Sequence, residues 1–436
     1  MTDTNLQFVN WFRSAAPYIR VHRGKTFVIQ FDDGLVHSDA FTDLVHDLAL
    51  LNSLGIHLVL VFGARQAIEA RLGENEQASA FHEGIRLTDA ETMELVKTAA
   101  GKLRVEIEAR LSMGLGNTPM DNAELVISSG NYVKAKPAGI VKGVDYQFTG
   151  TVRSIDSRAI KSKLDSGEIV LVPPLGYSKT GEVFNLGASE LAAQLAIDLK
   201  ADKLVYLIAG AGLRDSDGDI VRQVLYSEAE ALLVNCNTDE SVYLQAAIRA
   251  CNNGVPRVQL VDRQASGAIL QELFSRDGVG TMINNSSYDV IRLANENDIA
   301  AILSLIEPLE KKAVLVERSR EKLELEIGYF TIMQRDNVII GCAALYPFPA
   351  DSAAELACFT IHPDCHKQGM GEQLLEVMET SARKAGLKKL FVLTTQAEHW
   401  FLERGFTECT ITDLPVARQH LYNYQRNSLV LVRILD

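Results

Sequence analysis

Two hydrophobic patterns follow one another along this chain, and they require two different domains. From residue 26 to about 283, short apolar runs alternate with helical patterns, and the strand-like runs are FVIQF, HLVLVF, IVLVPP, KLVYLI, ALLVN and RVQLV. This alternation is typical of a mainly parallel sheet covered by helices. After residue 289 the strand-like runs come in succession: DVIRLA, LEIGYFTIMQRDN, VIIGCAALYPF, AELACFTIHP and KKLFVLTT. With helices expected at about 297–307, 371–385 and 398–404, the second part is predicted to be a compact α+β domain.

The domain boundaries are indicated by polar composition. The segment INNSSYD at residues 283–289 is the best linker candidate. We therefore expect an α/β domain over 26–283, a linker over 284–289 and the α+β domain over 290–436. Residues 1–25 predict an amphipathic helix that packs against a neighbour, because apolar side chains recur at helical spacing at Leu6, Phe8, Val9, Phe12 and Ala16.

Composition restricts the partners of the chain. Its 436 residues are too many for one ordinary core. The formal net charge of -13 argues against nonspecific binding to nucleic acid or anionic membranes, whose phosphates are repelled. No apolar run approaches the ~18 residues that span a bilayer, and the first residues do not form a secretion signal. The six cysteines lack paired spacing and fit free thiols, so a cytoplasmic location is expected.

The segment AELACFTIHPDCHKQGMGEQLLEVMETSARKAG carries the clearest chemical signal. A strand ends at Ile361, a loop leads to Gln368-Gly369-Met370-Gly371-Glu372, and a helix follows. Glycines let the main chain approach a phosphate, and N–H groups at the start of the helix face the anion. Because a bare pair of glycines also makes ordinary turns, it is the surrounding strand and helix that favour a phosphate site.

This strand, loop and helix resemble the coenzyme motif of the GNAT acetyltransferases across residues 354–385, and HWFLERGF at 399–406 resembles the segment that closes the coenzyme site in that family. The resemblance implies acetyl-CoA as co-substrate, held by Cys358, Phe359, Ile361, Gln368, Gly369, Met370, Gly371, Glu372, Phe401 and Arg404. Two positions depart from the family pattern. His366 replaces the usual arginine or glutamine, and Phe401 stands where many members carry the tyrosine that protonates the leaving thiolate.

Glu355 is the candidate catalytic base. It lies near the start of the strand that leads to the glycine loop, where many members of the family have a carboxylate. An amine must lose its proton before it attacks a thioester, and a positioned carboxylate removes that proton. Backbone N–H groups near Cys358 and Phe359 are expected to stabilise the oxyanion. The alternative is that Glu355 is a solvated residue at the edge of a strand.

Nearby cysteines and histidines allow two other interpretations. Cys358 fits a covalent acyl-cysteine, but a small thiol in a buried strand more often packs in a core. His362, Cys365 and His366 have the chemistry of zinc ligands, yet they lack a fourth partner and lie in the proposed coenzyme loop. No metal site is therefore predicted.

Two basic stretches, VERSREKLELEI and LYNYQRNSLVLV, supply candidate ligands for a small acidic acceptor. Guanidinium groups grip carboxylates through two parallel hydrogen bonds, and the candidates are Arg318, Arg320 and Arg426. Surface salt bridges with neighbouring glutamates are the alternative for each of them.

These stretches, with CAALYPFP and KLFVLTT, resemble the bacterial N-acetylglutamate synthase family, and the resemblance covers essentially the whole chain. It implies transfer of acetyl from acetyl-CoA to the α-amine of L-glutamate, the first step of arginine biosynthesis. By the same resemblance, Arg318 and Arg426 hold the carboxylates of glutamate.

Residues 26–283 resemble the amino-acid kinase fold, a three-layer α/β/α domain, most recognisably from Phe148 to Ala192. The positions that handle phosphate differ from the kinase pattern. The first strand and its turn, Gln30-Phe31-Asp32-Asp33-Gly34, lack the kinase lysine and paired glycines. The loop after the second strand reads Phe62-Gly63-Ala64-Arg65 where the kinase pattern has His-Gly-Gly-Gly, and Ser189 matches the catalytic aspartate. Because phosphoryl transfer needs cations and an organising carboxylate, we expect a regulatory domain.

The segment ASGAILQELFSRDGVGTMI at 265–283 resembles the arginine-binding segment of arginine-sensitive N-acetylglutamate kinases. The resemblance implies L-arginine as a feedback inhibitor, with Glu272 on its guanidinium or amine and with accessible carbonyls near Gly278 and Gly280. The helix within residues 1–25 resembles the one that joins kinase dimers into rings, so a homo-oligomer, a hexamer, is expected. An active kinase with an accessory acetyltransferase domain, and an arginine sensor or protein-lysine acetyltransferase, stay open as alternatives.

Overall fold

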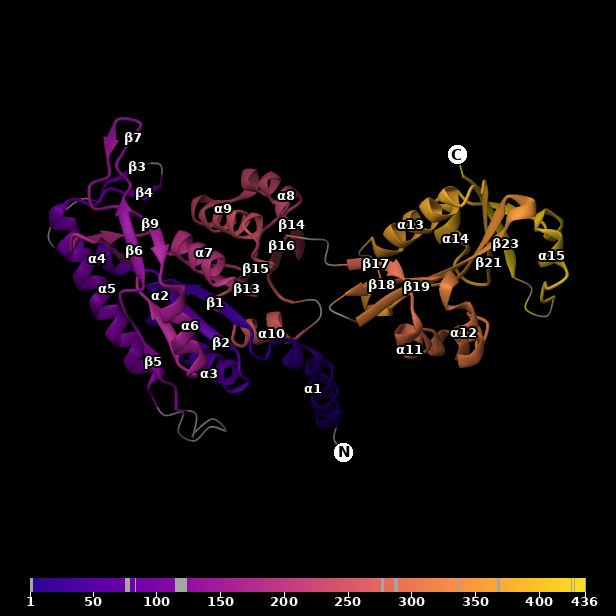
Figure 1. Cartoon of the computed structure of the whole chain (residues 1–436), viewed down its shortest axis with the longest axis horizontal. Coiled ribbons are helices and arrows are strands. Elements are labelled where there is room, and N and C mark those ends of the chain that lie inside the picture. Colours follow the sequence, from indigo (N-terminus) through magenta and orange to yellow (C-terminus); the bar gives the residue numbers. More distant parts are fainter. Residues whose placement is uncertain are drawn as a thin grey trace. The chain divides into compact units, whose positions relative to one another are not determined.

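The computed structural model describes residues 3–74, 79–82, 84–113, 124–275, 278–285, 289–335, 338–366, 369–424, 426 and 428–435. The chain divides into two compact units, Met1–Ser286 and Ser287–Asp436, and each is described by itself (Figure 1).

An eight-stranded sheet forms the centre of the first unit. Its order is β14-β16-β15-β13-β1-β2-β10-β5, in which the described pairs are parallel except for β15 with β16. The strands are β1 (Thr26–Phe31), β2 (His57–Phe62), β5 (Ile127–Ser128), β10 (Ile169–Val172), β13 (Lys203–Ile208), β14 (Gln223–Leu225), β15 (Arg257–Asp262) and β16 (Thr281–Asn284). The central strands are apolar and buried on both faces, as the predicted helix-covered parallel sheet requires.

Side chains alternate between two hydrophobic cores, one on each face of this sheet. Phe27 and Ile29 enter one core and Val28 enters the other. The first core is covered by α1 (Asp3–His22), α2 (Asp33–Val36), α3 (Ala40–Ser53), α4 (Arg65–Glu74), α5 (Ala90–Leu111) and α10 (Ala268–Phe274). The second is covered by α6 (Ser157–Asp165), α7 (Ala188–Leu199), α8 (Tyr226–Ala229) and α9 (Thr238–Asn252). The predicted three-layer α/β/α arrangement is confirmed (Figure 1).

One predicted strand of this unit is wrong. ALLVN, residues 231–235, belongs to a 3-10 helix, Glu230–Asn235. Val234 is 89 % exposed, whereas the central strands of the sheet bury both faces. A five-residue apolar run does not distinguish a strand from a helical turn, and here no neighbouring strand pairs with it among the described residues. The adjoining strand that does join the sheet edge is the short β14.

Smaller sheets complete the first unit. A four-stranded sheet has the order β12-β11-β6-β9, and two hairpins stand apart from it. The strands are β3 (Phe81–His82), β4 (Ile85–Arg86), β6 (Val133–Pro137), β7 (Ile140–Val141), β8 (Val144–Asp145), β9 (Gly150–Ile155), β11 (Leu175–Tyr177) and β12 (Val183–Asn185).

The second unit is built on a seven-stranded sheet of order β17-β18-β19-β20-β21-β23-β22. Its strands are β17 (Asp289–Leu293), β18 (Phe330–Arg335), β19 (Val338–Phe348), β20 (Ala353–Ile361), β21 (Lys389–Thr394), β22 (Thr407–Cys409) and β23 (Leu429–Ile434). Its described pairs are antiparallel except for β20 with β21. The expected strand over LEIGYF starts only at Phe330. The residues before it form helical turns, in which Leu325 is 87 % exposed.

Helices cover both faces of this second sheet, so the predicted α+β unit is confirmed. One core includes α11 (Ile299–Lys311) and α12 (Arg320–Glu326), and the opposite core includes α13 (Met370–Lys384) and α14 (Glu398–Leu402). The short α15 (Val416–Gln419) lies in the connection between β22 and β23.

Candidate functional site

Strand β20 is irregular at its centre. Cys342 of β19 pairs with Thr360, but the next pair joins Ala344 to Ala357, so Cys358 and Phe359 together stand opposite one residue. This is a β-bulge, and Cys358 has the left-handed φ of +51° that side chains rarely adopt. Strained backbone of this kind occurs where a strand redirects its main chain toward a functional site.

The same strand loses its parallel neighbour at Glu355. Pairing between β20 and β21 covers three positions and ends with Glu355 opposite Phe391. Beyond that point β21 continues to pair with β23. The part of β20 after Glu355 is therefore not paired to β21, and the main-chain groups on that side suit an extended ligand laid beside the strand.

Glu355 is buried, which excludes the interpretation of a solvated edge residue. Its carboxylate accepts two hydrogen bonds from Arg418 of α15, from Nε at 2.7 Å and from Nη2 at 3.1 Å. The Arg418 guanidinium also donates to the Leu421 carbonyl at 2.9 Å. Sequence reasoning missed Arg418, because it lies 63 residues away and outside the recognised stretches.

Two of the three predicted substrate arginines lie together. Arg318 Nη1 donates to the Val316 carbonyl, and Arg426 Nη2 donates to the Val314 carbonyl. Within the described chain, the Nε atoms of both are buried and have no hydrogen-bond partner. Burial, and then the positive charge of Arg318, lower the pKa of Arg426. Two like charges held close with unused donors are suited to a ligand that carries carboxylates.

Tyr346 connects this pair of arginines to Glu355. Tyr346 lies directly opposite Glu355 in the register of β19 and β20, so their side chains share one face of the sheet. Its hydroxyl donates to Glu326 Oε2 at 2.5 Å and also interacts with Arg318. The candidate base and Arg318 are therefore connected through Tyr346, and Arg426 lies near Arg318.

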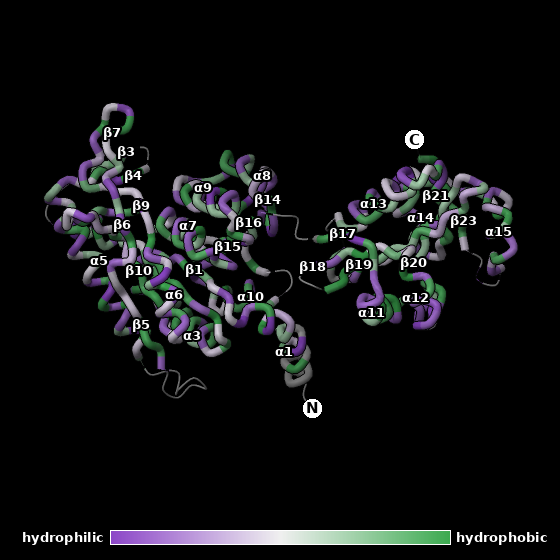
Figure 2. Tube along the Cα trace, viewed as in Figure 1, coloured by the Kyte–Doolittle hydropathy of each residue, from purple (hydrophilic) through white to green (hydrophobic). Residues whose placement is uncertain are grey.

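The structure does not bring Arg320 into this group. Arg320 starts the exposed helix α12, whose largely hydrophilic colour is visible in Figure 2, and it pairs with Glu324 one turn later at 3.0 Å. For this arginine the surface salt bridge is the arrangement found. An ion pair of this kind contributes little to stability.

The glycines of the predicted coenzyme loop have different structural roles. Gly369 precedes α13 with φ +73°, a conformation that favours glycine. Gly371 lies in the first turn of α13, and a Cβ there would stand 2.8 Å from the indole of Trp400. The second glycine thus allows α13 and α14 to approach closely. Met370 is buried in the core, and Gln368 lies outside the described residues.

Arg404 closes one side of this loop. It pairs with Glu372 and covers the Trp400 ring with its guanidinium 4.0 Å from the ring centre. The hydrogen bond from Arg404 lowers the pKa of Glu372. Phe401, by contrast, is buried in the core against Trp400 and Phe406. It has no dissociable proton, so the leaving thiolate must be protonated by another group or by water.

Neither a metal cluster nor a membrane span was found in the described ranges. No group of three or more His, Cys, Asp or Glu side chains there is arranged to hold a metal ion. The His366 ring instead contacts the Ile361 carbonyl at 3.0 Å. None of the described helices is both long and apolar enough to cross a membrane.

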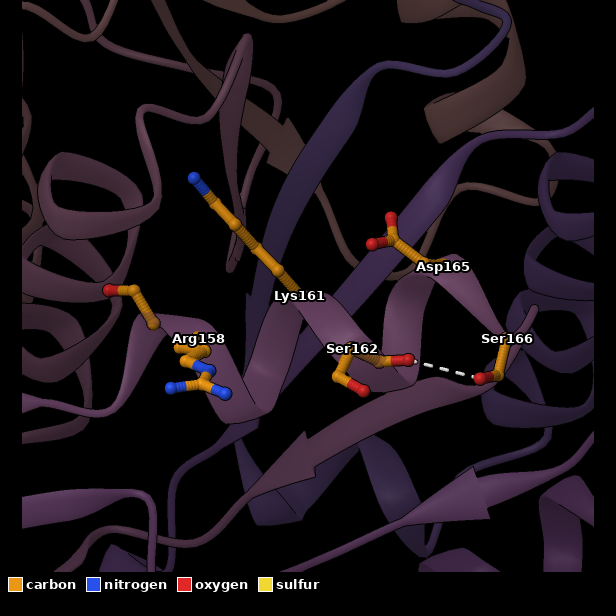
Figure 3. A pocket seen from close by; sticks show the side chains of 6 residues that line it. Arg158, Lys161, Ser162, Asp165 and Ser166 are labelled. Atoms are coloured by element: carbon orange, nitrogen blue, oxygen red, sulfur yellow. Dashed lines mark hydrogen bonds between the residues drawn. The ribbon is translucent and has the colours of Figure 1, made fainter.

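A surface hollow on the first unit lies along α6 and takes no part in these sites. The residues that line it all have polar or charged side chains, and one hydrogen bond among them joins the Ser166 hydroxyl to the Ser162 carbonyl at 3.0 Å (Figure 3). The lining residues come from one short stretch of chain: Ser157, Arg158, Lys161, Ser162, Asp165 and Ser166.

The predicted effector segment folds around Glu272 of α10. This buried carboxylate accepts hydrogen bonds from the N–H groups of Val279 at 2.7 Å and Gly280 at 2.9 Å. A Cβ on Gly278 would stand 2.5 Å from the same carboxylate, and one on Gly280 would overlap the Leu260 carbonyl. Both glycines are therefore required by close packing.

Helix α1 is attached to this segment. The His22 ring contacts the Leu273 carbonyl at 2.8 Å and packs edge-on against Phe274, and His22 itself is buried. The predicted assembly helix and the predicted effector segment are thus in direct contact within the first unit.

The chain's own carboxylates occupy the place where the kinase pattern handles phosphate. Asp33 accepts a hydrogen bond of 2.6 Å from the N–H of Ala67 in the first turn of α4, and burial raises the pKa of Asp33. Asp32 accepts hydrogen bonds from Gln30 at 3.2 Å and from Tyr243 at 2.7 Å. A helix N-terminus that suits an anion is therefore already filled by a side chain.

Comparison with known proteins agrees with both units. The amino acid kinase family matches residues 25–262, and the acetyltransferase (GNAT) family matches residues 298–406. The amino-acid acetyltransferase of Escherichia coli strain K12 is 49% identical over 436 residues, which cover 99% of this chain and 98% of that protein. The chain belongs to the same family of amino-acid acetyltransferases.

Solved structures of the same family show the same fold. The N-acetylglutamate synthase of Neisseria gonorrhoeae complexed with coenzyme A and L-arginine is 37% identical, with a TM-score of 0.89 over 98% of this chain and 99% of that one. The same enzyme complexed with coenzyme A and N-acetyl-glutamate has a TM-score of 0.64 over the same shares. This member of the N-acetylglutamate synthase family is thus an amino-acid acetyltransferase, with acetyl-CoA as its co-substrate.

Proposed function

We propose that this acetyltransferase moves acetyl from acetyl-CoA to the α-amine of L-glutamate, forming N-acetyl-L-glutamate and CoA as the first step of arginine biosynthesis. The observation that carries the proposal is the pair Arg318 and Arg426, two neighbouring cations whose buried Nε atoms have no partner in the described chain. A substrate with two carboxylates satisfies both donors and relieves their mutual repulsion. The gonococcal relative was solved with N-acetyl-glutamate, which has the same two carboxylates.

Glu355 acts as the general base in this proposal. The ammonium group of glutamate must become a neutral amine before attack, and Glu355 takes that proton directly or through water. Arg418 fixes the direction of the carboxylate by binding both of its oxygens. The acyl carbonyl then lies beside the bulge at Cys358 and Phe359, where a main-chain N–H stabilises the oxyanion.

The coenzyme binds along the bulged strand and the loop before α13. Cys358, Phe359 and Ile361 lie on β20, and Gly369, Met370, Gly371 and Glu372 form the turn into the helix. The start of α13 presents N–H groups to the pyrophosphate. Gln368 is proposed from the sequence alone. Arg404 supports this end of the site through its ion pair with Glu372 and its contact with Trp400. Phe401 supports the site indirectly, by packing in the core against Trp400.

L-Arginine is proposed to inhibit the enzyme by binding the kinase-like unit at Glu272, Gly278 and Gly280. The buried carboxylate of Glu272 suits the guanidinium or amine of the effector, and α10 leads directly to α1 through His22. The gonococcal relative was solved with L-arginine, which supports L-arginine as the effector. Inhibition then follows because arginine binds one arrangement of the assembly better than another.

We further propose that α1 joins copies of the chain into a homo-oligomer, a hexamer. Helix α1 exposes large apolar side chains at Val9, Trp11, Phe12 and Val21. An exposed apolar patch on one helix is characteristic of an interaction surface. All six cysteines are free thiols, which fits a reducing cytoplasm.

Thiol release from acetyl-CoA with a panel of amino acids, with and without arginine, tests this function. Glutamate should release thiol, whereas glutamine, neutral amino acids and lysine peptides should release little. Glu355→Gln should lower turnover at least ~100-fold if Glu355 is the base. Equal rates with glutamate and glutamine would exclude the carboxylate recognition proposed here.

A further inference from the structure

Two thiols meet behind the bulge of β20. Cys342 of β19 and Cys358 of β20 both belong to the core beneath α11 and α12, so they lie on the same face of neighbouring strands. The Cys342 thiol donates to the Cys358 carbonyl oxygen at 3.6 Å, and the two thiols lie close enough for each to change the pKa of the other. Both are free cysteines in this structure.

The two thiols are chemically unequal. Their mutual interaction, with help from the Arg318 cation, lowers the pKa of Cys358, whereas the same interaction and complete burial raise the pKa of Cys342. A low-pKa thiol beside a second thiol is the arrangement of a redox-active pair, because the thiolate attacks and the neighbour resolves. Cys251, in the other unit, shows the contrast: burial raises its pKa to about 12.

The backbone favours a reaction at Cys358. The bulge sets Cys358 and Phe359 together opposite one residue of β19, two positions along β20 from the partner of Cys342. Cys358 is held at φ +51°, a strained conformation. Because both cysteines are buried, an oxidant that reaches them must be as small as hydrogen peroxide.

We propose that Cys342 and Cys358 form a reversible disulfide when the enzyme meets a peroxide, and that this bond stops acetyl transfer. The consequence for activity rests on the function proposed above, whereas the disulfide itself does not. Cys358 lies three residues after the candidate base, at the proposed oxyanion site. A disulfide from Cys358 to Cys342 of β19 holds the bulge in a shape that differs from that of the reduced enzyme.

The reaction balances with a peroxide as oxidant. The Cys358 thiolate attacks one peroxide oxygen, the O–O bond breaks, and hydroxide leaves to become water. The Cys342 thiol then attacks the sulfenic sulfur, the S–O bond breaks, a second water leaves and the S–S bond forms. Two thiols lose two electrons in total, and the peroxide gains them. A thiol reductant reverses the reaction by exchange.

The sequence allows a direct measurement of the bond. Trypsin leaves both cysteines on one peptide, residues 336–367, because it contains no internal lysine or arginine, and cleavage after Glu355 separates Cys342 from Cys358. The full-length protein is treated with hydrogen peroxide, blocked with N-ethylmaleimide and cut with both proteases. We expect fragments 336–355 and 356–367 to stay joined until a reductant is added. Tandem mass spectrometry then distinguishes Cys358 from Cys365.

Activity is measured on the same samples. Peroxide should lower glutamate-dependent thiol release at least ~10-fold, and dithiothreitol should restore it. In Cys342→Ala, Cys358 has no partner thiol, so this variant should keep its activity after peroxide treatment. If the sulfenic acid on Cys358 oxidises further, the variant should instead lose activity that dithiothreitol does not restore. The matched control Cys251→Ala should behave like the unchanged enzyme. If the alanine variant folds poorly, Cys342→Ser serves the same purpose.

Two results overturn the proposal. The first is separate fragments after peroxide treatment, since the disulfide is then absent. The second is reversible inactivation of Cys342→Ala equal to that of the unchanged enzyme. A reduced enzyme that releases no thiol with glutamate contradicts the proposed function instead, while the joined fragments still report the bond.

Discussion

Arg418 of α15 binds both oxygens of the Glu355 carboxylate on the central strand β20, at 2.7 and 3.1 Å. The two side chains are largely shielded from solvent, with 20% and 11% of their surfaces exposed. A bidentate pair of this kind sets the direction of a carboxylate as well as its charge. The base of the proposed reaction is therefore positioned by a residue of a short connecting helix.

The first prediction concerns that position. Arg418→Gln should lower kcat by roughly 10- to 100-fold with little change in the KM for acetyl-CoA, because the carboxylate loses its orientation while the coenzyme loop is untouched. The kcat of Arg418→Lys should lie between that of Arg418→Gln and that of the unchanged enzyme, because lysine keeps the positive charge but cannot donate two parallel hydrogen bonds. Steady-state kinetics on both variants provide the measurement. An unchanged kcat in a folded Gln variant would show that the pair is only structural.

The second prediction separates the three arginines. Arg318→Ala or Arg426→Ala should raise the KM for glutamate by about 10- to 100-fold, since a hydrogen bond to a charged group contributes roughly 1.5–3 kcal/mol. Arg320→Ala is the matched control, because Arg320 pairs with Glu324 at the surface. Its KM should not change. Initial rates at varied glutamate concentration report the effect, and equal changes in all three variants would contradict the site described here.

The third prediction concerns the coenzyme loop. Gly371→Ala should raise the KM for acetyl-CoA, because a Cβ there meets the Trp400 ring at 2.8 Å and pushes α13 away from α14. Gly328→Ala has open space around its Cβ and an unstrained φ, so it serves as the control. A several-fold difference between the two variants is expected from kinetics with varied acetyl-CoA. The KM for glutamate should stay the same in both.

The fourth prediction tests the effector site. Glu272→Gln should weaken inhibition by arginine at least ~10-fold while activity without arginine is kept, because the amide cannot pair with a guanidinium but still accepts a hydrogen bond from the loop. Dose–response curves and isothermal titration with arginine measure this. Inhibition of normal potency in this variant would place the arginine site elsewhere.

The fifth prediction is a pH dependence of stability. Burial, and then the nearby Asp43, raise the pKa of Asp47 in α3 from 3.8 to about 7. The folded protein therefore binds a proton more tightly than the unfolded chain, so this group's contribution to stability is present below pH 3.8 and is lost as the pH rises toward 7.

The substitution Asp47→Asn removes the loss of stability that Asp47 causes as the pH rises. Urea unfolding should show a gain of order 2 kcal/mol at pH 8 relative to the unchanged protein and a much smaller difference at pH 4. This value is below the full linkage energy because solvent screens part of the effect. A difference that does not vary with pH would contradict the assignment.

Much of the fold could be predicted because it depends on local patterns. The alternating apolar runs specify strands and covering helices, and the strand-glycine-helix order specifies the coenzyme loop, since each pattern spans only neighbouring residues. The same approach went wrong at 231–235, where an apolar run lacks a neighbouring strand and forms a helical turn instead. It also selected Arg320, whose residue type suits a carboxylate but whose side chain faces solvent.

The sequence by itself determined the two domains, the family, the candidate base Glu355 and the loss of phosphate-handling residues at Gln30 and Ser189. Only the tertiary structure decided which distant side chains meet: Arg418 on Glu355, and Cys342 beside Cys358. The physical reason is that these contacts depend on strand register, a bulge and a short helix between strands. Such features are set by the packing of the whole sheet, and no local pattern of residues encodes them.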